Sequence, residues 1–327
     1  MKILIIPYAT ESPGVPLGPH TFREVHLRQI EEAAAGRAEV VVALPEDATV
    51  NLADVDVIAG FPSAMPDFAN APNLRWVHSF SAGVDRVLTP DIRERDILLS
   101  NSSGIHATPI AEHILGFLLL FTRGFYRTFK NQAAHVWQKD ETLGELRDAH
   151  VLIVGLGAIG AETARLAAAF SAHVSAVARG AREKSAFVER IGVTADMDAM
   201  LPEADFVVIT LPYTPETHHF FSAERFALMK PSSVIINIGR GGIIDQAALI
   251  DALNAKKIFG AALDVTDPEP LPSDSPLWGM ENVIITPHHS GLSGEYMNRA
   301  VSLFCDNLRA FLDGSPLPTE VDKIVGY

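Results

Sequence analysis

Three side chains that together could reduce a carbonyl group stand in separate stretches of the C-terminal half of the chain. They are the cation Arg240, the acid Glu269 and the imidazole of His288. The stretches read NIGRGGIID, ALDVTDPEPLP and ITPHHSG, and each follows an expected strand. Because ligands of doubly wound sheets bind beyond the carboxyl ends of the strands, the three side chains could converge there. Each residue alone also fits an ordinary role as a turn cation, a loop acid or a strand-end histidine.

A glycine-rich loop, GLGAIG at Gly155–Gly160, follows the expected strand VLIV and precedes an expected helix. In such a loop Gly155 makes the tight turn, Gly157 lets the backbone approach a pyrophosphate, and Gly160 lets helix and strand pack closely. The anion would lie at the positive N-terminal end of the helix. The strand–helix setting favours dinucleotide binding over the plain alternative, a structural glycine turn.

The next expected strand, Val174–Ala178, ends without the acid that NAD-binding folds usually carry there. An acid about 20 positions past the loop would bond the ribose 2′-hydroxyl of NAD. Here Ala178 is followed by Arg179, whose planar guanidinium could hold a 2′-phosphate. We therefore expect NADP(H) to be preferred, with NAD(H) possible, and expect Arg182 or Lys184 to add long-range attraction. The plain alternative is a solvated surface arginine.

Short apolar runs separated by helical or loop segments indicate two series of parallel β-α-β units. In the N-terminal third we expect a helix at His20–Ala35 and strands at Ile3–Ile6, Val40–Leu44, Val55–Ala59, Trp76–Ser79 and Ile97–Leu99. Further along, we expect strands at Val151–Val154, Val174–Ala178, Phe206–Ile209, Val234–Asn237, Gly260–Asp264 and Val283–Ile285. Helices are expected at Ala161–Phe170, Ala223–Met229, Gln246–Asn254 and about Gly294–Leu312.

A long apolar helix is expected between the two series. Thr108 can cap it, Pro109 suits its first turn, and apolar residues continue to Phe121. Because this helix is apolar on all sides, we expect it to be buried between domains or subunits.

The composition limits the classes of function. The 327 residues suggest about two domains. The formal net charge of −14 argues against general binding to nucleic acids or anionic membranes. The single cysteine, Cys305, allows no intramolecular disulfide. The apolar run Ile114–Phe121 is far shorter than the ~18 residues of a membrane span, and the opening MKILIIP is too short for a secretory signal. We expect a cytoplasmic protein with no metal, nucleic-acid or membrane partner.

Several stretches, in order along the chain, make it similar to the D-isomer-specific 2-hydroxyacid dehydrogenase family. Besides the four stretches above they are SAGVD at 81–85, SSGIHATPIAEH at 102–113 and LPYTPET at 211–217. The resemblance covers most of the chain. It implies an α/β fold of two doubly wound parallel-sheet domains. A Rossmann NAD(P)-binding domain, 102–289, would be inserted into a discontinuous flavodoxin-like substrate domain, 1–101 and 290–327.

The resemblance also implies roles for individual residues. Arg240 would bind the substrate carboxylate and polarise the keto oxygen. Backbone amides of Ala82 and Gly83 would add hydrogen bonds to the carboxylate. His288 would be the general acid in reduction and the base in oxidation, and Glu269 would orient its imidazole and favour the protonated form.

Two neighbouring histidines, His288 and His289, compete for the acid–base role. Neighbouring side chains in extended backbone point opposite ways, so only one should face the cleft. The family pattern selects His288.

The cofactor-binding residues implied by the resemblance extend well beyond the glycine loop, and among them Asp264 would contact the nicotinamide amide. The full set is Gly155, Gly157, Ala158, Ile159, Gly160, Arg179, Leu211, Pro212, Thr217, Ile238, Gly239, Arg240, Asp264 and His288.

The resulting hypothesis is an NADPH-preferring reductase that converts small 2-keto acids, such as glyoxylate, hydroxypyruvate or a pyruvate-like acid, to D-2-hydroxy acids. Because NAD-using members commonly carry Asp at the position of Ala178, the chain looks like the NADP-preferring glyoxylate and hydroxypyruvate reductase branch. A homodimer is implied, with a helix over Ile110–Phe129 in its interface and Trp137 of the partner subunit near the substrate. Two alternatives stay open: a nucleotide-sensing binding protein without turnover, and a phosphite- or formate-type dehydrogenase.

Overall fold

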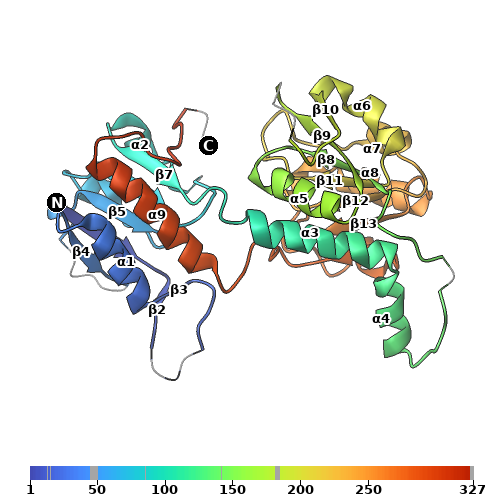
Figure 1. Cartoon of the computed structure of the whole chain (residues 1–327), viewed down its shortest axis with the longest axis horizontal. Coiled ribbons are helices and arrows are strands. Elements are labelled where there is room, and N and C mark those ends of the chain that lie inside the picture. The colour runs from blue at the N-terminus through green and yellow to red at the C-terminus, as the bar shows by residue number, and fades with distance from the viewer. Residues whose placement is uncertain are drawn as a thin grey trace. The chain divides into compact units, whose positions relative to one another are not determined.

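The computed structural model describes residues 1–12, 14, 16–44, 51–84, 86–140, 142–180 and 185–324 (Figure 1). It divides into a first unit, Met1–His106 with Leu292–Tyr327, and a second unit, Ala107–Gly291. Residues 102–106, expected in the cofactor domain, belong to the first unit, since Ser102 hydrogen-bonds Ser79 and Ser81 there.

The first unit is built on a five-stranded parallel sheet in the order β4-β1-β5-β6-β7. Its strands are β1 (Lys2–Ile6), β4 (Glu39–Val42), β5 (Val57–Gly60), β6 (Trp76–Ser79) and β7 (Leu98–Asn101). Its helices are α1 (Glu24–Ala34), α2 (Pro90–Glu94) and α9 (Tyr296–Leu312). In chain order the strands run 2-1-3-4-5, which is the expected flavodoxin-like order.

Both faces of this sheet are apolar and covered. On one face Ile5 and Trp76 belong to a core that includes Phe304 of α9, and the Trp76 and Phe304 rings stack with centroids 5.2 Å apart. On the other face Ile58 and Val77 belong to a second core. Strands buried on both faces read as continuous apolar runs, which is why they were predictable from the sequence.

The helix expected at His20–Ala35 begins later, at Glu24. Thr21–Phe22 forms the short strand β3, which pairs with β2 (Ala9–Thr10) in parallel. Arg23 has extended backbone, with φ of −118°, and donates its N–H to His26 Nδ1. The expectation was wrong for these first residues because a β-branched and an aromatic side chain favour strand pairing, which apolar periodicity does not register.

The second unit is built on a seven-stranded parallel sheet in the order β10-β9-β8-β11-β12-β13-β14. The strands are β8 (His150–Val154), β9 (His173–Ala178), β10 (Arg190–Val193), β11 (Phe206–Ile209), β12 (Val234–Asn237), β13 (Gly260–Leu263) and β14 (Val283–Ile285). The helices are α3 (Ala107–Thr122), α4 (Phe125–Ala133), α5 (Ala158–Ala169), α6 (Met197–Met200), α7 (Ala223–Leu228) and α8 (Gln246–Asn254). The 3₁₀ turns of both units are Leu52–Asp54, Phe68–Asn70, Thr194–Asp196, Leu201–Glu203, Gly241–Ile243 and Pro276–Gly279. The strand order 3-2-1-4-5-6, extended by one strand, is that of a Rossmann domain, as expected.

Strand β10 and the start of helix α5 differ from the expectation. Strand β10 was not predicted, because this edge strand mixes the exposed Arg190 with few buried residues. Helix α5 begins at Ala158 instead of Ala161, since Gly157 is its N-cap. The glycine loop therefore contributes its last residues to the helix itself, which brings the N-terminal amides of α5 close to the end of β8.

The long helix of the expectation is two helices. Helix α3 already includes Thr108, which was expected as its cap, and it ends at Thr122. Gly124 has φ of +61°, and α4 follows it, so no single helix spans 110–129. Within the described residues no helix is both long and apolar enough to cross a membrane.

A buried polar chain lies beneath the loop that follows β6. Trp76 Nε1 donates to Ser100 Oγ (2.9 Å), which lies 2.7 Å from His78 Nδ1. Ser102 Oγ lies 3.4 Å from His78 Nε2 and donates to the Ser79 carbonyl (3.1 Å). All of these groups are satisfied when a neutral His78 accepts at Nδ1 and donates from Nε2. Burial lowers the pKa of His78 to about 3.

This histidine should make the protein less stable in acid. With a pKa of 6.5 in the unfolded chain and about 3 when folded, His78 binds a proton more readily after unfolding. Its contribution to stability is therefore complete above about pH 6.5 and is lost as the pH falls toward 3, by roughly 2–3 kcal/mol at about pH 4.5. Urea unfolding of the wild type and of His78→Asn at neutral and acid pH measures this. An equal pH dependence in both proteins would contradict it.

Candidate active site

The glycine loop between β8 and α5 is shaped by contacts of its own backbone. Gly155 has φ of +107°, and a Cβ on Gly160 would lie 2.1 Å from the Gly155 carbonyl oxygen. A Cβ on Gly157 would meet no protein atom within 4 Å. The fold therefore requires the first and last glycines, whereas Gly157 borders an open space at the N-terminal end of α5. An exposed helix N-terminus with this space beside it fits the pyrophosphate of a dinucleotide.

The register of the sheet brings several loops to one edge. The last residues of β8, β11, β12 and β13 lie side by side across the sheet: Val154 pairs with Ile209, Ile209 with Asn237, and Asn237 with Leu263. The segments beyond them hold further predicted cofactor residues: Ala158 and Ile159 in the first turn of α5, and Leu211, Pro212, Thr217, Ile238 and Gly239 in loops. All of these residues follow carboxyl ends of neighbouring strands, where doubly wound sheets bind ligands.

Arg179 directly follows β9 and is exposed, while Ala178 before it is buried. The guanidinium of Arg179 lies near enough to Glu216 to influence that carboxylate. A hydrogen bond from Thr214 is the main cause that lowers the pKa of Glu216, and the charge of Arg179 adds to it. Arg182 and Lys184, which were expected to add attraction, lie outside the described residues.

The Arg240 turn is held by its own backbone and by the neighbouring loop. The side chain of the buried Asn237 accepts from Gly239 N (3.0 Å) and donates to the Arg240 carbonyl (3.0 Å). A Cβ on Gly241 would lie 2.0 Å from the Thr266 carbonyl oxygen. The turn after β12 therefore packs directly on the loop after β13. The guanidinium of Arg240 is exposed and donates to the Gly239 carbonyl (2.8 Å).

Glu269 and His288 form a hydrogen-bonded pair. Glu269 Oε2 lies 2.9 Å from His288 Nδ1, and Glu269 Oε1 accepts from Thr266 N (3.1 Å). A carboxylate only accepts, so Nδ1 carries the proton, and Nε2 is left for chemistry. The two side chains are 37% and 49% exposed, respectively, so a ligand can reach the imidazole. The expected partnership of this acid and this histidine is therefore present in the geometry.

The backbone distinguishes His288 from His289 in an unexpected way. His288 has φ of +51° and donates its N–H to the Asp264 carbonyl (2.8 Å). The premise of extended backbone, from which the two imidazoles were expected to point apart, is therefore wrong. His289 nevertheless has different surroundings: its ring lies 5.5 Å from the ring of His113.

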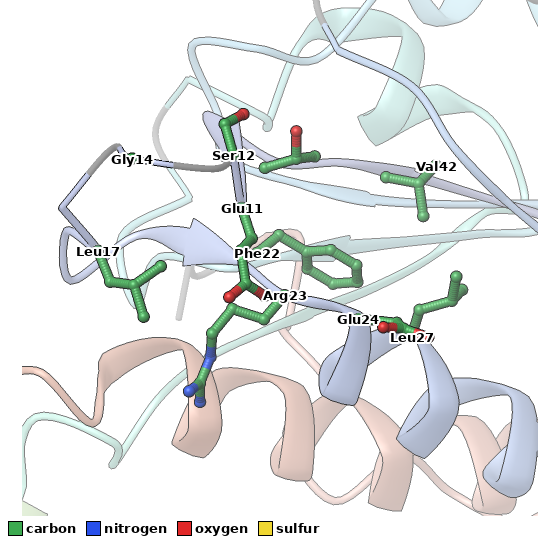
Figure 2. Close-up of a pocket in the computed structure, with 10 residues that line it drawn as sticks. Glu11, Ser12, Gly14, Leu17, Phe22, Arg23, Glu24, Leu27 and Val42 are labelled. Atoms are coloured by element: carbon green, nitrogen blue, oxygen red, sulfur yellow. The ribbon is translucent and has the colours of Figure 1, made fainter.

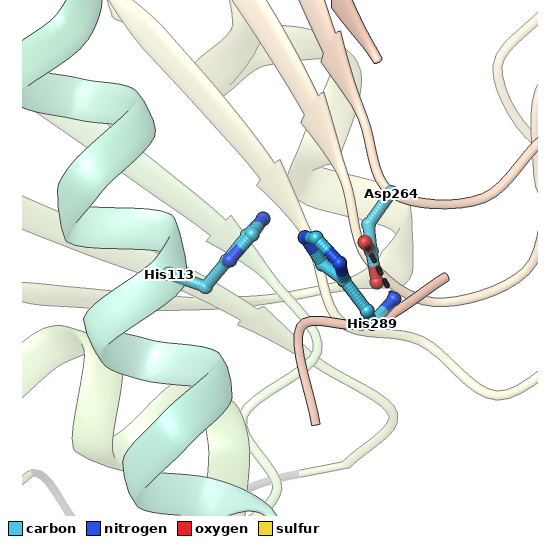
Figure 3. Close-up of side chains that lie close together, drawn as sticks. All are labelled: His113, Asp264 and His289. Carbon is cyan, nitrogen blue, oxygen red and sulfur yellow. Dashed lines mark hydrogen bonds between the residues drawn. The ribbon is translucent and has the colours of Figure 1, made fainter. Parts of the chain in front are cut away.

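Asp264, directly after β13, lies beside His289 and bonds the backbone of the segment that carries both histidines (Figure 3). Its carboxylate is buried and accepts from Thr286 Oγ1 (2.6 Å), His289 N (3.1 Å) and Ser290 N (3.1 Å). Burial raises the pKa of Asp264, but the hydrogen bonds from Ser290, Thr286 and His289 outweigh it and keep the pKa below its usual value. The residue is thus an ionised carboxylate that organises the backbone around it.

The loop with Ala82 and Gly83 belongs to the first unit and follows β6. The successive carbonyl groups of residues 79–82 each accept a hydrogen bond. The donors are, in order, Ser102 Oγ (3.1 Å), Tyr296 Oη (2.8 Å), Ser102 N (3.2 Å) and Asn101 Nδ2 (2.6 Å). This loop is therefore rigidly held from the carbonyl side.

The first unit also contains an open hollow of about 710 Å³ (Figure 2). Its lining includes apolar Phe22 and Leu27, and none of the predicted site residues. Arg23 at its rim donates to Asn298 (2.6 Å). We do not assign a site to it.

Sequence reasoning missed the residues that hold the site in place. Asn237 occurs in the stretch quoted for Arg240, and Asn101 and Ser102 stand at the end of β7, so polar residues after apolar strands were the available signal. Thr286 precedes the Pro-His pair. Tyr296 gave no signal, because its partner is more than two hundred residues away in the chain.

A model of the family described as D-isomer specific 2-hydroxyacid dehydrogenase, NAD binding domain, matches residues 115–290. The glyoxylate reductase of Pyrococcus furiosus is 33% identical over 283 residues, which are 83% of this chain and 84% of that protein. Glyoxylate/hydroxypyruvate reductase B of Escherichia fergusonii is 34% identical over 249 residues, which are 75% of this chain and 76% of that protein.

Solved structures agree over nearly the whole chain. A D-isomer specific 2-hydroxyacid dehydrogenase family protein from Aeromonas salmonicida has a TM-score of 0.83 at 32% identity, covering 98% of this chain and 99% of its own. An NADPH-dependent glyoxylate/hydroxypyruvate reductase from Sinorhizobium meliloti, solved with NADP and sulfate, has a TM-score of 0.78 at 31% identity, with 100% of both chains covered.

The Rossmann sheet with its glycine loop, and the acid–histidine pair beside it, define a nicotinamide-dependent oxidoreductase. The chain belongs to the D-isomer specific 2-hydroxyacid dehydrogenase family, which confirms the resemblance seen in the sequence. It is an NAD(P)-dependent enzyme of that family, acting on CH–OH donors.

The glycine loop gives a matched pair of variants. Gly160→Ala should lower the free energy of unfolding by roughly 1–3 kcal/mol or more, because its methyl group overlaps the Gly155 carbonyl. Gly157→Ala should stay within about 1 kcal/mol of the wild type and yet bind NADPH much more weakly, because its methyl group enters the open space. Urea unfolding and fluorescence titration with NADPH measure the two effects. Normal NADPH binding by Gly157→Ala would mean that the pyrophosphate lies elsewhere.

Proposed function

We propose that this protein is an NADPH-preferring reductase of small 2-keto acids, with glyoxylate, hydroxypyruvate and pyruvate-like acids as substrates and D-2-hydroxy acids as products. The observation that carries the proposal is the 2.9 Å contact between Glu269 Oε2 and His288 Nδ1, which leaves Nε2 open. This pair stands beside the turn that bears Arg240. A proton donor, its orienting acid and a cation suit reduction of a carbonyl next to a carboxylate.

In the proposed reaction the protein handles the proton and the negative charges. The nicotinamide, when bound, supplies the hydride that reaches the carbonyl carbon. Protonated His288 gives the proton on Nε2 to the carbonyl oxygen, while Glu269 holds the ring through Nδ1–H. Arg240 binds the carboxylate and polarises the keto oxygen. The amides of Ala82 and Gly83, in the first unit, add hydrogen bonds to the same carboxylate.

The preference for NADPH rests on the end of β9. No carboxylate stands at Ala178 to bond a 2′-hydroxyl, and the exposed guanidinium of Arg179 follows it. Two relatives solved with this cofactor add support: the Sinorhizobium meliloti reductase with NADP, and a D-isomer specific 2-hydroxyacid dehydrogenase from Xanthobacter autotrophicus with NADPH. The other cofactor contacts that we propose are the residues given in the sequence analysis, with the second unit, Ala107–Gly291, as the cofactor domain.

We also propose a homodimer. Phe125 and Phe129 of α4 are 44% and 58% exposed, their rings stack, and Trp137 beyond the helix is 98% exposed. Large aromatic side chains of this kind are enriched in interfaces. A contact through α4 and the segment after it would cover them.

A substrate panel with both cofactors tests the proposal. NADPH oxidation should be followed with glyoxylate, hydroxypyruvate, pyruvate and a phenyl-substituted keto acid, and again with NADH. Fast turnover of the small acids with NADPH supports the proposal. Cofactor binding without turnover would favour the nucleotide-sensing alternative, and reduction of NADP or NAD by phosphite or formate would favour the third hypothesis.

The acid–base role predicts different results for two neighbouring histidines. His288→Ala should lower kcat by roughly 10²–10⁴-fold with the Kd for NADPH nearly unchanged, because the proton donor is lost and the nucleotide site is intact. His289→Ala is the control and should keep most of the activity, since its ring has no contact with Glu269 among the described residues. The kcat of both variants should be measured with glyoxylate. If His289→Ala were the inactive variant, His289 rather than His288 would be the general acid.

The phosphate-binding role predicts a cofactor-specific effect of Arg179→Ala. Each charge-assisted hydrogen bond to a phosphate is worth about 1.5–3 kcal/mol, on the order of tenfold to a hundredfold in affinity. The KM for NADPH should rise by that factor, and the KM for NADH should stay unchanged because NADH has no phosphate there. Arg190→Ala removes an equal charge at the far end of the neighbouring strand β10, and it should change neither KM. Equal weakening of both cofactors by Arg179→Ala would mean that Arg179 supports the adenine or the loop.

A further inference from the structure

A chain of hydrogen bonds leads from helix α3 to the segment that carries His288. His113 Nε2 lies 3.2 Å from Thr286 Oγ1, and Thr286 Oγ1 donates to Asp264 Oδ1 at 2.6 Å. Because the ionised carboxylate can only accept, the single hydroxyl proton of Thr286 is committed to it. The hydroxyl therefore accepts from His113, and His113 carries its ring proton on Nε2.

The far end of this chain is the backbone around His288. Asp264 accepts from the amides of three consecutive residues: His288 N to the Asp264 carbonyl (2.8 Å), His289 N to Oδ1 (3.1 Å) and Ser290 N to Oδ2 (3.1 Å). His288 has φ of +51°, a conformation that a residue other than glycine keeps only when its surroundings hold it. His288 N also lies 3.0 Å from the Thr286 carbonyl, and together these four bonds account for that conformation.

His113 reaches the carboxylate from a separate element. Its ring packs edge-on against Phe117 of the same helix, 4.5 Å between centroids, and its pKa is lowered chiefly by burial. A neutral, fixed imidazole suits the role of a donor to Thr286. None of the predicted roles includes His113 or Thr286.

We propose that His113 and Thr286 are positioning residues for the proton donor: they fix the rotamer of the Asp264 carboxylate. The carboxylate holds the amides of His289 and Ser290, directly after His288, and so keeps the His288 backbone in the conformation that presents Nε2. This inference rests on the proposed function, because it needs His288 to be the general acid. It differs from the family-based expectation for Asp264, in which the carboxylate serves the nicotinamide amide.

The same side chains could be interpreted as a metal site. One ligand atom from each of His113, Asp264 and His289 lies within 4.8 Å of the others. The hydrogen bonds argue against this interpretation: Nε2 of His113 is engaged with Thr286, and both carboxylate oxygens already accept from protein groups. Figure 3 shows the His289 backbone amide, rather than its ring, bonded to the acid.

The test uses Thr286→Val, which keeps the shape of the side chain and removes the hydroxyl, with Thr286→Ser as the matched control. We expect Thr286→Val to lower kcat at least tenfold, to leave the Kd for NADPH within twofold, and to raise the solvent isotope effect on kcat, because a misplaced donor slows proton transfer. Thr286→Ser should be close to the wild type. His113→Gln, which can place an N–H donor at a similar reach to Nε2 of the histidine, should show a smaller fall in kcat than His113→Ala.

A double-mutant cycle with His288→Ala separates the inference from the proposed function. If Thr286 acts through His288, then Thr286→Val should cause no further loss of kcat in the His288→Ala background. Absence of turnover by the wild type with every keto acid of the panel would refute the proposed function itself, whereas full activity of His288→Ala would refute the acid–base role of His288. A loss of kcat by Thr286→Val that is equal in both backgrounds would overturn the positioning role alone. The positioning role would also be overturned if Thr286→Val raised the Kd for NADPH and left kcat unchanged. Inhibition of the wild type by zinc that is absent in His113→Gln would likewise overturn it, because it would indicate a metal site.

Discussion

The hydrogen bond between Glu269 and His288 joins two loops that follow the neighbouring strands β13 and β14, and the chemistry of the second unit depends on its geometry. The strands pair with Leu263 opposite Ile285, so both loops leave the sheet at the same edge. A slip of one residue in this register would turn each strand's side chains to the opposite face and separate the loops. The apolar residues of both strands oppose such a slip, because they would lose their place in the core.

Packing of backbone on backbone adds Arg240 to this pair. Gly241 lies against Thr266 so closely that a Cβ would overlap the carbonyl, which brings the turn after β12 onto the loop after β13. Asn237 then ties the turn to itself with two side-chain bonds. The relative position of cation and acid therefore depends on steric fit and on a buried amide, while the reactive side chains remain exposed.

The sequence predicted most of this arrangement where the signal is local. Strand β11 is apolar at every position and β12 at every position but its last, Asn237, and both are buried throughout, so their bounds agreed with the structure. The carboxyl-end rule alone predicts that Arg240, Glu269 and His288 lie at one edge of the sheet. Edge strand β10 was not predicted, since its exposed and partly buried residues give only a weak hydrophobic pattern. The break at Gly124 was not predicted, because a single glycine within a helical pattern is compatible with a continuing helix.

Long-range partners could not be predicted in the same way. The left-handed conformation of His288 depends on Asp264, 24 residues earlier, and nothing in the local stretch ITPHHSG requires it. Likewise the loop at residues 79–82 is held by Tyr296, which is more than two hundred positions away. Hydrogen bonds between distant segments follow from the fold, so they become visible only when the fold is known.

The charges of the second unit show how an acidic chain can bind two anions. The protein has a net charge of −14, which repels both a phosphorylated dinucleotide and a keto acid at long range. Near the sheet edge, hydrogen bonds compensate the charge of two acids: Asp264 accepts from three donors, and Glu269 accepts from His288 and the Thr266 amide.

The exposed guanidinium groups of Arg179 and Arg240 and the N-terminus of α5 stand along the same edge. Because screening by salt shortens the reach of the net charge to about 8–10 Å, these local positive groups dominate once an anion is close. The compensation of the acids is therefore as important for binding anions as the presence of the cations.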